Sequence, residues 1–407
     1  MVLRSNLLPR SAARFLFQFA GVAALVAGCG GGGGDAGTPP FGNGSGAAAS
    51  SFAAGPITGF GSVILGGIRF DDNNAKVTDD DGVETTPDAL KLGMTAEVHA
   101  GKISDDGTGP RAEASEISFG SALLGPVSAV DATAKSLVVL GQTVLVVDTT
   151  VLDDRLVGGF AGITVGTVLE VHGTIDATTG AITATRIEPS AAAAGFKIRG
   201  IVANLDTTAQ TFSIGTALIS YAGITPAPSG LVNGLLVRVR LQTAQVAGAW
   251  VATRLSPAAP HVGDADRAEL EGTITAFTSS TSFSVNGIPV DASTAQFPNG
   301  STGIVLGAHV EVEGASSNGV VVATKVSVET QEERHAAGFE LHGAITALDS
   351  TAQTFVLRGV TVSYAGAGIE YKNGSAATLA VGVQLEVKGT LSADGKTLQA
   401  TRISFGD

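Results

Sequence analysis

The residues of this chain that could bind a metal ion begin with an acidic stretch that runs from Asp71 to Asp81. Its carboxylates are of the kind that calcium takes, but their spacing differs from that of a helix-loop-helix calcium loop. Aligning Gly82 with the sixth position of such a loop places Val77 first and Asp88 last, where Asp and Glu are needed. A solvated turn is therefore the favoured interpretation, and an irregular, weak ion site near Asp71 to Asp81 stays the alternative.

Two histidines, His99 and His172, occupy equivalent positions of related segments, and imidazole is a common metal ligand. The other copies of this position hold Arg240, Glu313 and Lys388. A metal site needs converging ligands in a fixed setting, which such variation argues against. We therefore predict a solvated strand face here, and no metal ligand.

Nucleotide binding and nucleophilic catalysis lack their usual motifs. The stretch from Gly389 to Thr397 resembles a phosphate-binding loop, but that motif needs Gly at the position of Asp394. We predict a hairpin turn at Asp394 and Gly395 instead. The sequence has no Gly-x-Ser-x-Gly elbow, and no His lies beside a credible Ser-Asp pair. We expect no catalytic residue, no cofactor and a protein that is not an enzyme.

The chemistry that the sequence does predict is lipidation of Cys29, the only cysteine. A basic leader and an apolar run precede it, as in a secretory signal. The run is short for a membrane span, which needs about 20 residues, so cleavage is expected. The segment before the cysteine resembles the lipobox of bacterial lipoproteins, in which the thiol is acylated; its members are Leu25, Val26, Ala27 and Gly28. Because Gly30 follows, the resemblance implies the outer membrane.

Composition limits the partners. The net charge of −13 disfavours nucleic acid, because phosphate binding relies on Lys and Arg. Aromatic residues make up only 5%, which leaves few platforms for sugars, among them Trp250, Tyr221, Tyr364 and Tyr371. Tyr221 and Tyr364 hold matching places before Ala-Gly, so a core or rim role is favoured for both.

Two glycine markers repeat with a period of about 70 residues, as expected of tandem modules. One set opens each unit, at Gly55, Gly125, Gly200, Gly272 and Gly343, and the other precedes an alternating run, at Gly93, Gly166, Gly234, Gly307 and Gly382. In each alternating run every second residue is apolar or small, as in Leu385 and Val387, while charged residues such as Glu386 and Lys388 lie between them. This period is typical of half-buried strands.

We therefore predict an all-β chain, a tandem array of five small five-stranded barrels of the oligonucleotide/oligosaccharide-binding type or compact β-sandwiches. They follow a lipoprotein signal and a flexible linker. The predicted parts are a signal peptide at 1–28, a Gly/Ala/Ser-rich tether at 29–54, and modules at 55–120, 123–189, 196–257, 267–329 and 338–407.

The Gly-x-Val/Ile-x-Ala openings and the Val-Gly-x-x-Leu-Glu-Val-x-Gly run at Val165 and again at Val381 resemble a family of bacterial lipoprotein domains. This family is catalogued only as a domain of unknown function, numbered five-six-six-six. The resemblance covers residues 55 to 407 and consists of scaffold positions. It implies fold and compartment, and carries over no catalytic residue.

Three functions remain as hypotheses. The first is a non-enzymatic cell-envelope protein, held at the outer membrane by its lipid anchor, which binds an unidentified envelope protein or glycan. The second is an envelope hydrolase with a site between modules, which a cleft gathering two carboxylates or a perturbed His would favour. The third, binding of single-stranded nucleic acid, lacks the basic grooves and stacking rings that it needs.

Overall fold

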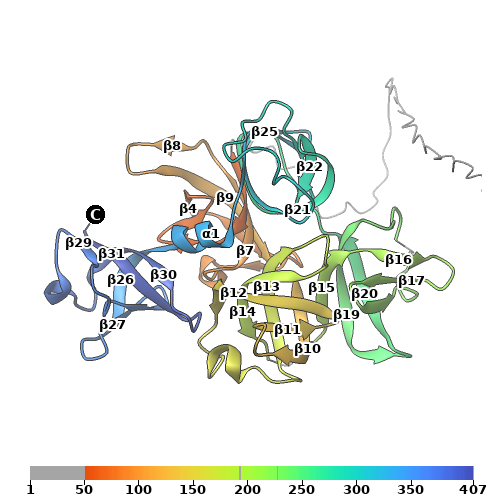
Figure 1. Ribbon diagram of the computed structural model, residues 1–407, viewed down its shortest axis with the longest axis horizontal. Coiled ribbons are helices and arrows are strands. Elements are labelled where there is room, and N and C mark those ends of the chain that lie inside the picture. The colour runs from red at the N-terminus through yellow and green to blue at the C-terminus, as the bar shows by residue number, and fades with distance from the viewer. Residues whose placement is uncertain (1–50, 192–193, 227, 407) are drawn as a thin grey trace, which may run out of the picture. The chain divides into compact units, whose positions relative to one another are not determined.

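The computed structural model describes residues 51–191, 194–226 and 228–406, and these residues form an all-β fold with one short α-helix (Figure 1). The lipidation site Cys29, the lipobox, the predicted signal peptide and residues 29–50 of the predicted tether lie outside them. Within the described ranges, no helix has the length and apolar character needed to cross a bilayer.

The strands of residues 123–189 close into a small barrel. Four neighbouring pairs are antiparallel, and the third and fifth strands pair in parallel, so the order around the ring is first, second, third, fifth, fourth and back to the first. This arrangement fits a Greek-key barrel and not a two-sheet sandwich. The strands are β10 (Leu123–Asp131), β11 (Ser136–Val139), β12 (Gln142–Leu152), β13 (Val168–Ile175) and β14 (Ile182–Pro189).

The same order of pairing recurs further along the chain. After residue 195 the strands are β15 (Phe196–Ile201), β16 (Ala203–Asp206), β17 (Thr211–Ile214), β18 (Ala217–Ser220), β19 (Leu236–Val246) and β20 (Ala249–Pro257). Then come β21 (Ala265–Ser279), β22 (Ser282–Val285), β23 (Ile288–Asp291), β24 (His309–Ser317) and β25 (Val320–Val328), which Figure 1 shows end-on as a ring. The last strands are β26 (Phe339–Asp349), β27 (Thr354–Leu357), β28 (Val360–Ser363), β29 (Glu370–Lys372), β30 (Gln384–Leu391) and β31 (Thr397–Phe405).

The first described segment follows this order with broken strands. Its strands are β1 (Ser51–Pro56), β2 (Gly59–Phe60), β3 (Val63–Leu65), β4 (Ile68–Asp71), β5 (Lys76–Asp79), β6 (Glu84–Thr85), β7 (Thr95–Ala100), β8 (Ser104–Asp105) and β9 (Pro110–Gly120). Residues 51–54 were expected to be tether, but they belong to β1, because Phe52 is buried against the ring of His99. Short 3-10 helices lie at Pro87–Ala89, Gly159–Gly162 and Ala376–Thr378.

A helix also forms in the predicted linker at 330–337, where the sequence analysis expected none. Helix α1 (Gln331–Ala337) begins with a capping box, in which Thr330 and Glu333 each accept from the backbone amide of the other. This exchange satisfies two of the amides that a helix start leaves free. The helix carries Arg334 toward the strands before it, a contact that matters below.

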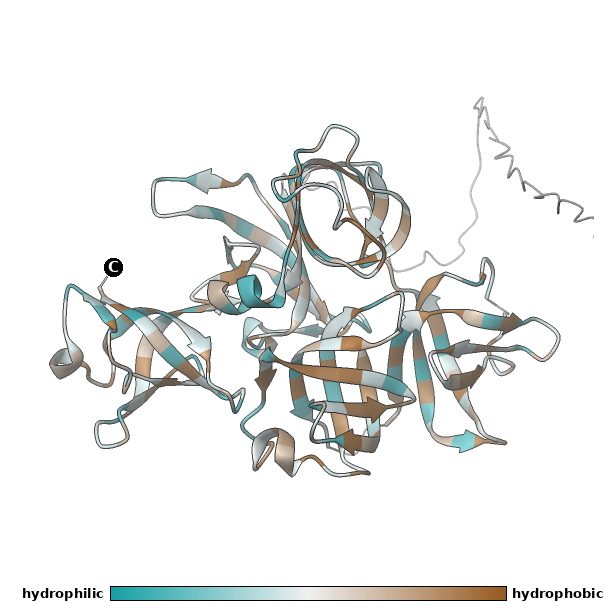
Figure 2. Ribbon diagram, viewed as in Figure 1, coloured by the Kyte–Doolittle hydropathy of each residue, from teal (hydrophilic) through white to brown (hydrophobic). Residues whose placement is uncertain are grey.

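The predicted alternation places apolar side chains in the barrel interiors, and this prediction is confirmed. Leu169 and Val171 of β13 are fully buried, as are Val310 and Val312 of β24. Brown and teal therefore alternate along the strands in Figure 2. The glycine that precedes each alternating run has a positive φ, between 82° and 91°, in every copy. A side chain would strain this turn, which explains why the marker repeats.

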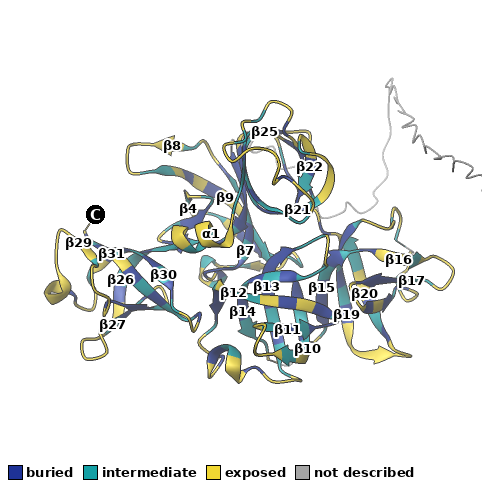
Figure 3. Cartoon of the chain, viewed as in Figure 1, coloured by how far each residue is buried: buried dark blue, intermediate teal, exposed yellow. Residues whose placement is uncertain are grey.

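The outward positions of the same strands are charged but not freely solvated. None of Glu97, Glu170, Arg238, Glu311 and Glu386 is exposed, since each is half-buried. Figure 3 shows half-buried positions along the strands in teal. Neighbouring segments of the chain cover these faces. For example, β1 pairs in parallel with β21 as well as antiparallel with β7. Charges on these faces therefore need partners.

One such charge is compensated by a buried ion pair. The side chain of Asp80 is only 3% exposed, and it contacts Lys197, which is 6% exposed. Arg238 lies on the same carboxylate, with 3.3 Å between its Nε and Asp80 Oδ2. Removing the cation would leave a carboxylate buried without its closest partner.

We expect Lys197→Met to destabilise the chain by about 3 kcal/mol, because it leaves the Asp80 carboxylate short of a buried cation. Trp250, the only tryptophan, lies edge-on to Phe196 with ring centroids 5.7 Å apart, so its fluorescence during urea unfolding reports on the strands beside Lys197. The control is Lys135→Met, which removes an exposed pair with Asp148 and is expected to cost under about 1 kcal/mol. Equal losses in the two variants would contradict the structural role of the buried pair.

Candidate functional site

Several carboxylates gather on the outer face of the barrel at residues 265–328. Strand β21 pairs with β24 so that two glutamates lie directly opposite two others: Glu269 faces Glu313, and Glu271 faces Glu311. Like charges in opposed positions of an antiparallel pair repel each other. His309 starts β24, and the amide of Glu329 donates to the carbonyl of His309 at 3.0 Å, which sets these two side by side.

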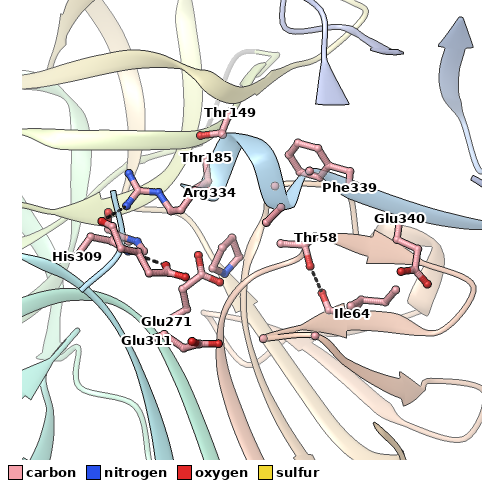
Figure 4. A pocket seen from close by; sticks show the side chains of 18 of the residues that line it. Thr58, Ile64, Thr149, Thr185, Glu271, His309, Glu311, Arg334, Phe339 and Glu340 are labelled. Carbon is pink, nitrogen blue, oxygen red and sulfur yellow. Dashed lines mark hydrogen bonds and ion pairs between the residues drawn. The ribbon is translucent and has the colours of Figure 1, made fainter. Parts of the chain in front are cut away.

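A cavity of about 270 Å³ opens over part of this face (Figure 4). Glu271, His309, Glu311 and Glu329 line it together with Arg334. Other lining residues come from segments far away in the sequence, and include Thr58, Thr185, Phe339, Glu340 and Lys388. In Figure 4 the ring of Phe339 lies on the other side of the cavity from His309. The cavity therefore has an acidic end and an end with an aromatic ring.

Burial dominates the protonation of this acidic end. It raises the pKa of Glu271 to about 8, and the charge of Glu329 adds to the effect. It raises the pKa of Glu269 to about 9, with the charges of Glu311 and Glu313 contributing. Burial lowers the pKa of His309, because it disfavours the imidazolium form. The neutral forms of these groups are thus favoured wherever no counter-charge is present.

The geometry suits a cation or a ligand rich in hydrogen-bonding groups. One ligand atom each of Glu271, His309 and Glu329 lie within 4.8 Å of one another. His309 Nδ1 is 3.3 Å from Glu329 Oε2, and neither atom has a hydrogen-bond partner. Arg334 donates to the main-chain carbonyl of Glu329 at 3.4 Å. Three carboxylates and one guanidinium leave this end of the cavity with a negative balance, so an anion is disfavoured.

The acidic stretch from Asp71 to Asp81 forms ion pairs in part, so the prediction of a solvated turn is wrong for its last two residues. Asp80 contacts Lys197, and Asp81 accepts from Arg240 Nε at 2.7 Å. Asp79 accepts from two backbone amides of its own turn. The three carboxylate and histidine clusters found among the described residues include no member of this stretch.

The prediction of a solvated face at His172 is also wrong. Only 1% of this residue is exposed, and its Nδ1 lies 2.9 Å from the carbonyl of Gly120, to which the neutral ring donates. Burial lowers the pKa of His172 to about 4. His99 is half-buried, with its ring 5.0 Å from that of Phe52. The structure does not bring these two histidines together in a common cluster of the described residues.

Other sequence predictions are confirmed. Asp394 and Gly395 form the turn between β30 and β31, where Asp394 Oδ1 accepts from the amide of Lys396 at 2.9 Å. Tyr221 and Tyr364 belong to the cores, each with its ring 5.9 Å from a phenylalanine.

The cluster of Glu271, His309 and Glu329 was not predicted, although the sequence carries a signal for it. Only the copy at 267–329 combines two features. Both outward positions of its alternating run are Glu, and Glu269 and Glu271 also precede its opening glycine. The alternation showed that these residues face outward. What covers that face depends on contacts between distant segments, which periodicity does not reveal.

Replacing His172 by Asn is expected to weaken the loss of stability in acid. The pKa of His172 is lower in the folded chain than in the unfolded chain, so the unfolded chain binds more protons in acid. The contribution of His172 to stability is therefore fully present above about pH 6.5 and is lost as the pH falls toward 4. Asn keeps a donor for Gly120 and does not titrate. The measurement is urea unfolding at pH 7 and pH 4.5, with the exposed His261→Asn as control. An unchanged difference between the two pH values in the His172 variant would contradict this explanation.

Comparison with known proteins gives matches to one family model. No curated protein matches the sequence. The family model described as "Domain of unknown function (DUF5666)" matches three times, at residues 125–188, 271–327 and 342–404. Each match spans one barrel and extends from the opening glycine or its neighbour to the last strand. Three segments of the chain are therefore similar to this family's domain, and the matches together cover less than half of the chain.

Proposed function

We propose that this protein is a non-enzymatic cell-envelope lipoprotein, anchored through Cys29 at the outer membrane, in which five copies of the barrel act as a scaffold and bind an envelope glycan or protein. The strand pairing of residues 51–120 and 196–257, outside the family matches, supports the count of five. The single cysteine at the end of the apolar leader supports the anchor.

The observation that carries the binding function is the cavity shared by several barrels. Ligand sites are usually concave, with apolar walls and a few converging polar groups. This cavity has the ring of Phe339 and the side chain of Thr58 toward one end, and Glu271 and Glu311 toward the other. Sugar hydroxyls donate to carboxylates and sugar faces pack on aromatic rings, so this lining favours a glycan over an apolar ligand. Its negative balance disfavours nucleic acid.

An envelope hydrolase is the second candidate, and the same cavity favours it. The acidic end gathers Glu271 and Glu311, both with a pKa raised by burial, beside His309. A carboxyl group that stays protonated near neutral pH can act as a general acid, and a neighbouring carboxylate can act as a base or nucleophile. This arrangement meets the condition that the sequence analysis set for a hydrolase.

The lipid anchor predicts the behaviour of Cys29→Ala. Wild-type cells fed an alkyne-labelled fatty acid are expected to label the protein and to hold it in the membrane fraction, since several acyl chains bind a bilayer strongly. The variant is expected to lose the label and leave that fraction. Labelling of the variant, or an unlabelled wild type, would show that Cys29 is not the anchor.

The glycan proposal predicts that Phe339→Ala weakens retention of soluble peptidoglycan fragments by the detergent-solubilised full chain by about tenfold, equivalent to ~1.4 kcal/mol. The matched control is Phe277→Ala, which truncates an exposed phenylalanine of β21 outside the cavity lining. Equal retention by all three proteins would contradict a glycan site at this cavity. Cleavage of the fragments by wild type, lost in Glu271→Gln, would favour the hydrolase instead.

A further inference from the structure

The outer face of β21, β24 and β25 is a three-by-three grid of side chains. The register places Glu269, Glu313 and Lys325 in one row, Glu271, Glu311 and Ser327 in the next, and Thr273, His309 and Glu329 in the last. The first row contains its own cation: Lys325 Nζ contacts Glu313 and lies 3.8 Å from Glu311. The other rows contain no lysine or arginine, although Glu271, Glu311 and Glu329 bring three carboxylates.

An internal copy of the same face shows how the fold handles such a concentration of like charge. In the barrel at 196–257 the equivalent positions are all basic: Lys197 faces Arg240, and Arg199 faces Arg238. Here the counter-charges come from another segment, because Asp80 contacts Lys197 and Arg238, and Asp81 contacts Arg240. A like-charged face is thus matched by charges of the opposite sign.

The acidic face lacks this match at one end, where Arg334 donates to the main-chain carbonyl of Glu329 and forms no ion pair among the described residues. Among the ion pairs of the described residues, Glu271 makes none, and Glu329 meets only His309. His309 Nδ1 and Glu329 Oε2 are buried atoms that face each other without a hydrogen bond. Glu269, only 3% exposed one row away, also has a buried oxygen without a partner. The same end opens to the cavity, so a ligand can reach it.

We propose that Glu271, His309 and Glu329 bind a divalent transition-metal ion at the acidic end of this cavity. Their ligand atoms converge within 4.8 Å. One imidazole and two carboxylates form a ligand set that zinc accepts, with a fourth position left for water or a ligand hydroxyl from the cavity. The imidazole favours a transition metal over calcium or magnesium, which prefer oxygen ligands. The ion supplies the counter-charge for the acidic face. Asp80 and Asp81 supply the counter-charge for the basic face of the barrel at 196–257.

The related cluster of Glu340, His342 and Glu386 does not need an ion, because cations of the chain already serve it. Glu340 contacts Arg69, and Lys388 Nζ lies 2.7 Å from its other oxygen. His342 Nε2 is 2.6 Å from the same carboxylate. Although burial opposes it, hydrogen bonds from His342 and Lys388 and the charge of Arg69 hold the pKa of Glu340 far below its usual range. The contrast singles out the cluster of β21 and β24.

The test is zinc binding by the detergent-solubilised full chain after chelator treatment and dialysis, followed by calorimetry. One equivalent of Zn²⁺ is expected to bind, and Glu271→Gln and His309→Asn are each expected to weaken binding by about 100-fold, as loss of a protein ligand does. The matched controls are Glu313→Gln, in the same strand as His309 but paired with Lys325, and the exposed His261→Asn. Both controls are expected to keep wild-type affinity.

A second measurement uses the wild-type chain alone, so it does not depend on the folding of a variant. Diethylpyrocarbonate modification, mapped by mass spectrometry, is expected to be slowed at His309 by Zn²⁺ and to be unaffected at His261. Absence of zinc binding by the folded wild type, or binding that neither ligand variant weakens, would overturn the proposal. Glycan retention measured in chelator separates this outcome from a failure of the glycan proposal, because the ring of Phe339 acts without the ion.

Discussion

Burying charge on the outer faces of the barrels is the constraint on which the rest of this structure depends. A charged group removed from water costs free energy unless another charge or hydrogen bonds compensate it. The inward faces meet the ordinary demands of a β-barrel core with Val, Ile and Leu. The outward faces of the first and fourth strands are covered as well, so their charged residues decide how one segment of the chain can lie against another.

The barrels differ in how the residue at one equivalent position is compensated. The position of His172 is filled by a neutral ring that donates to Gly120, while Arg240 in the same position pairs with Asp81. In the same position, Lys388 forms an ion pair with Glu340, and Glu313 forms an ion pair with Lys325. Repeats that keep one core and vary one face can pack on different neighbours without a change of fold. A solvated face was predicted from the variation at this position. The variation instead reflects a different contact in each of these barrels.

The sequence was sufficient for what depends on local period and weak for what depends on contacts between distant segments. The positive φ of Gly93 and its equivalents, and the alternation after them, follow from rules that operate within a few residues. The helix at Gln331 was not predicted, although Thr330 and Glu333 form a capping box that a local rule identifies. The burial of Phe52 and His172 arises from pairing across long distances, such as that of β1 with β21, and no local pattern predicts it.

The cluster of Glu271, His309 and Glu329 shows why an uncompensated charge is more informative than a compensated one. Where the chain supplies both signs, as for Asp80 and Lys197, the interaction is complete and explains the contact between segments. Where it supplies mainly one sign, as at this end of the cavity with Arg334 beside several carboxylates, either protons or an outside cation must complete it. Protons would neutralise Glu271, whose pKa is raised, but they would not join its carboxyl group, His309 and Glu329 in one interaction. A metal ion satisfies all three side chains at once, and this is the physical reason to expect one there.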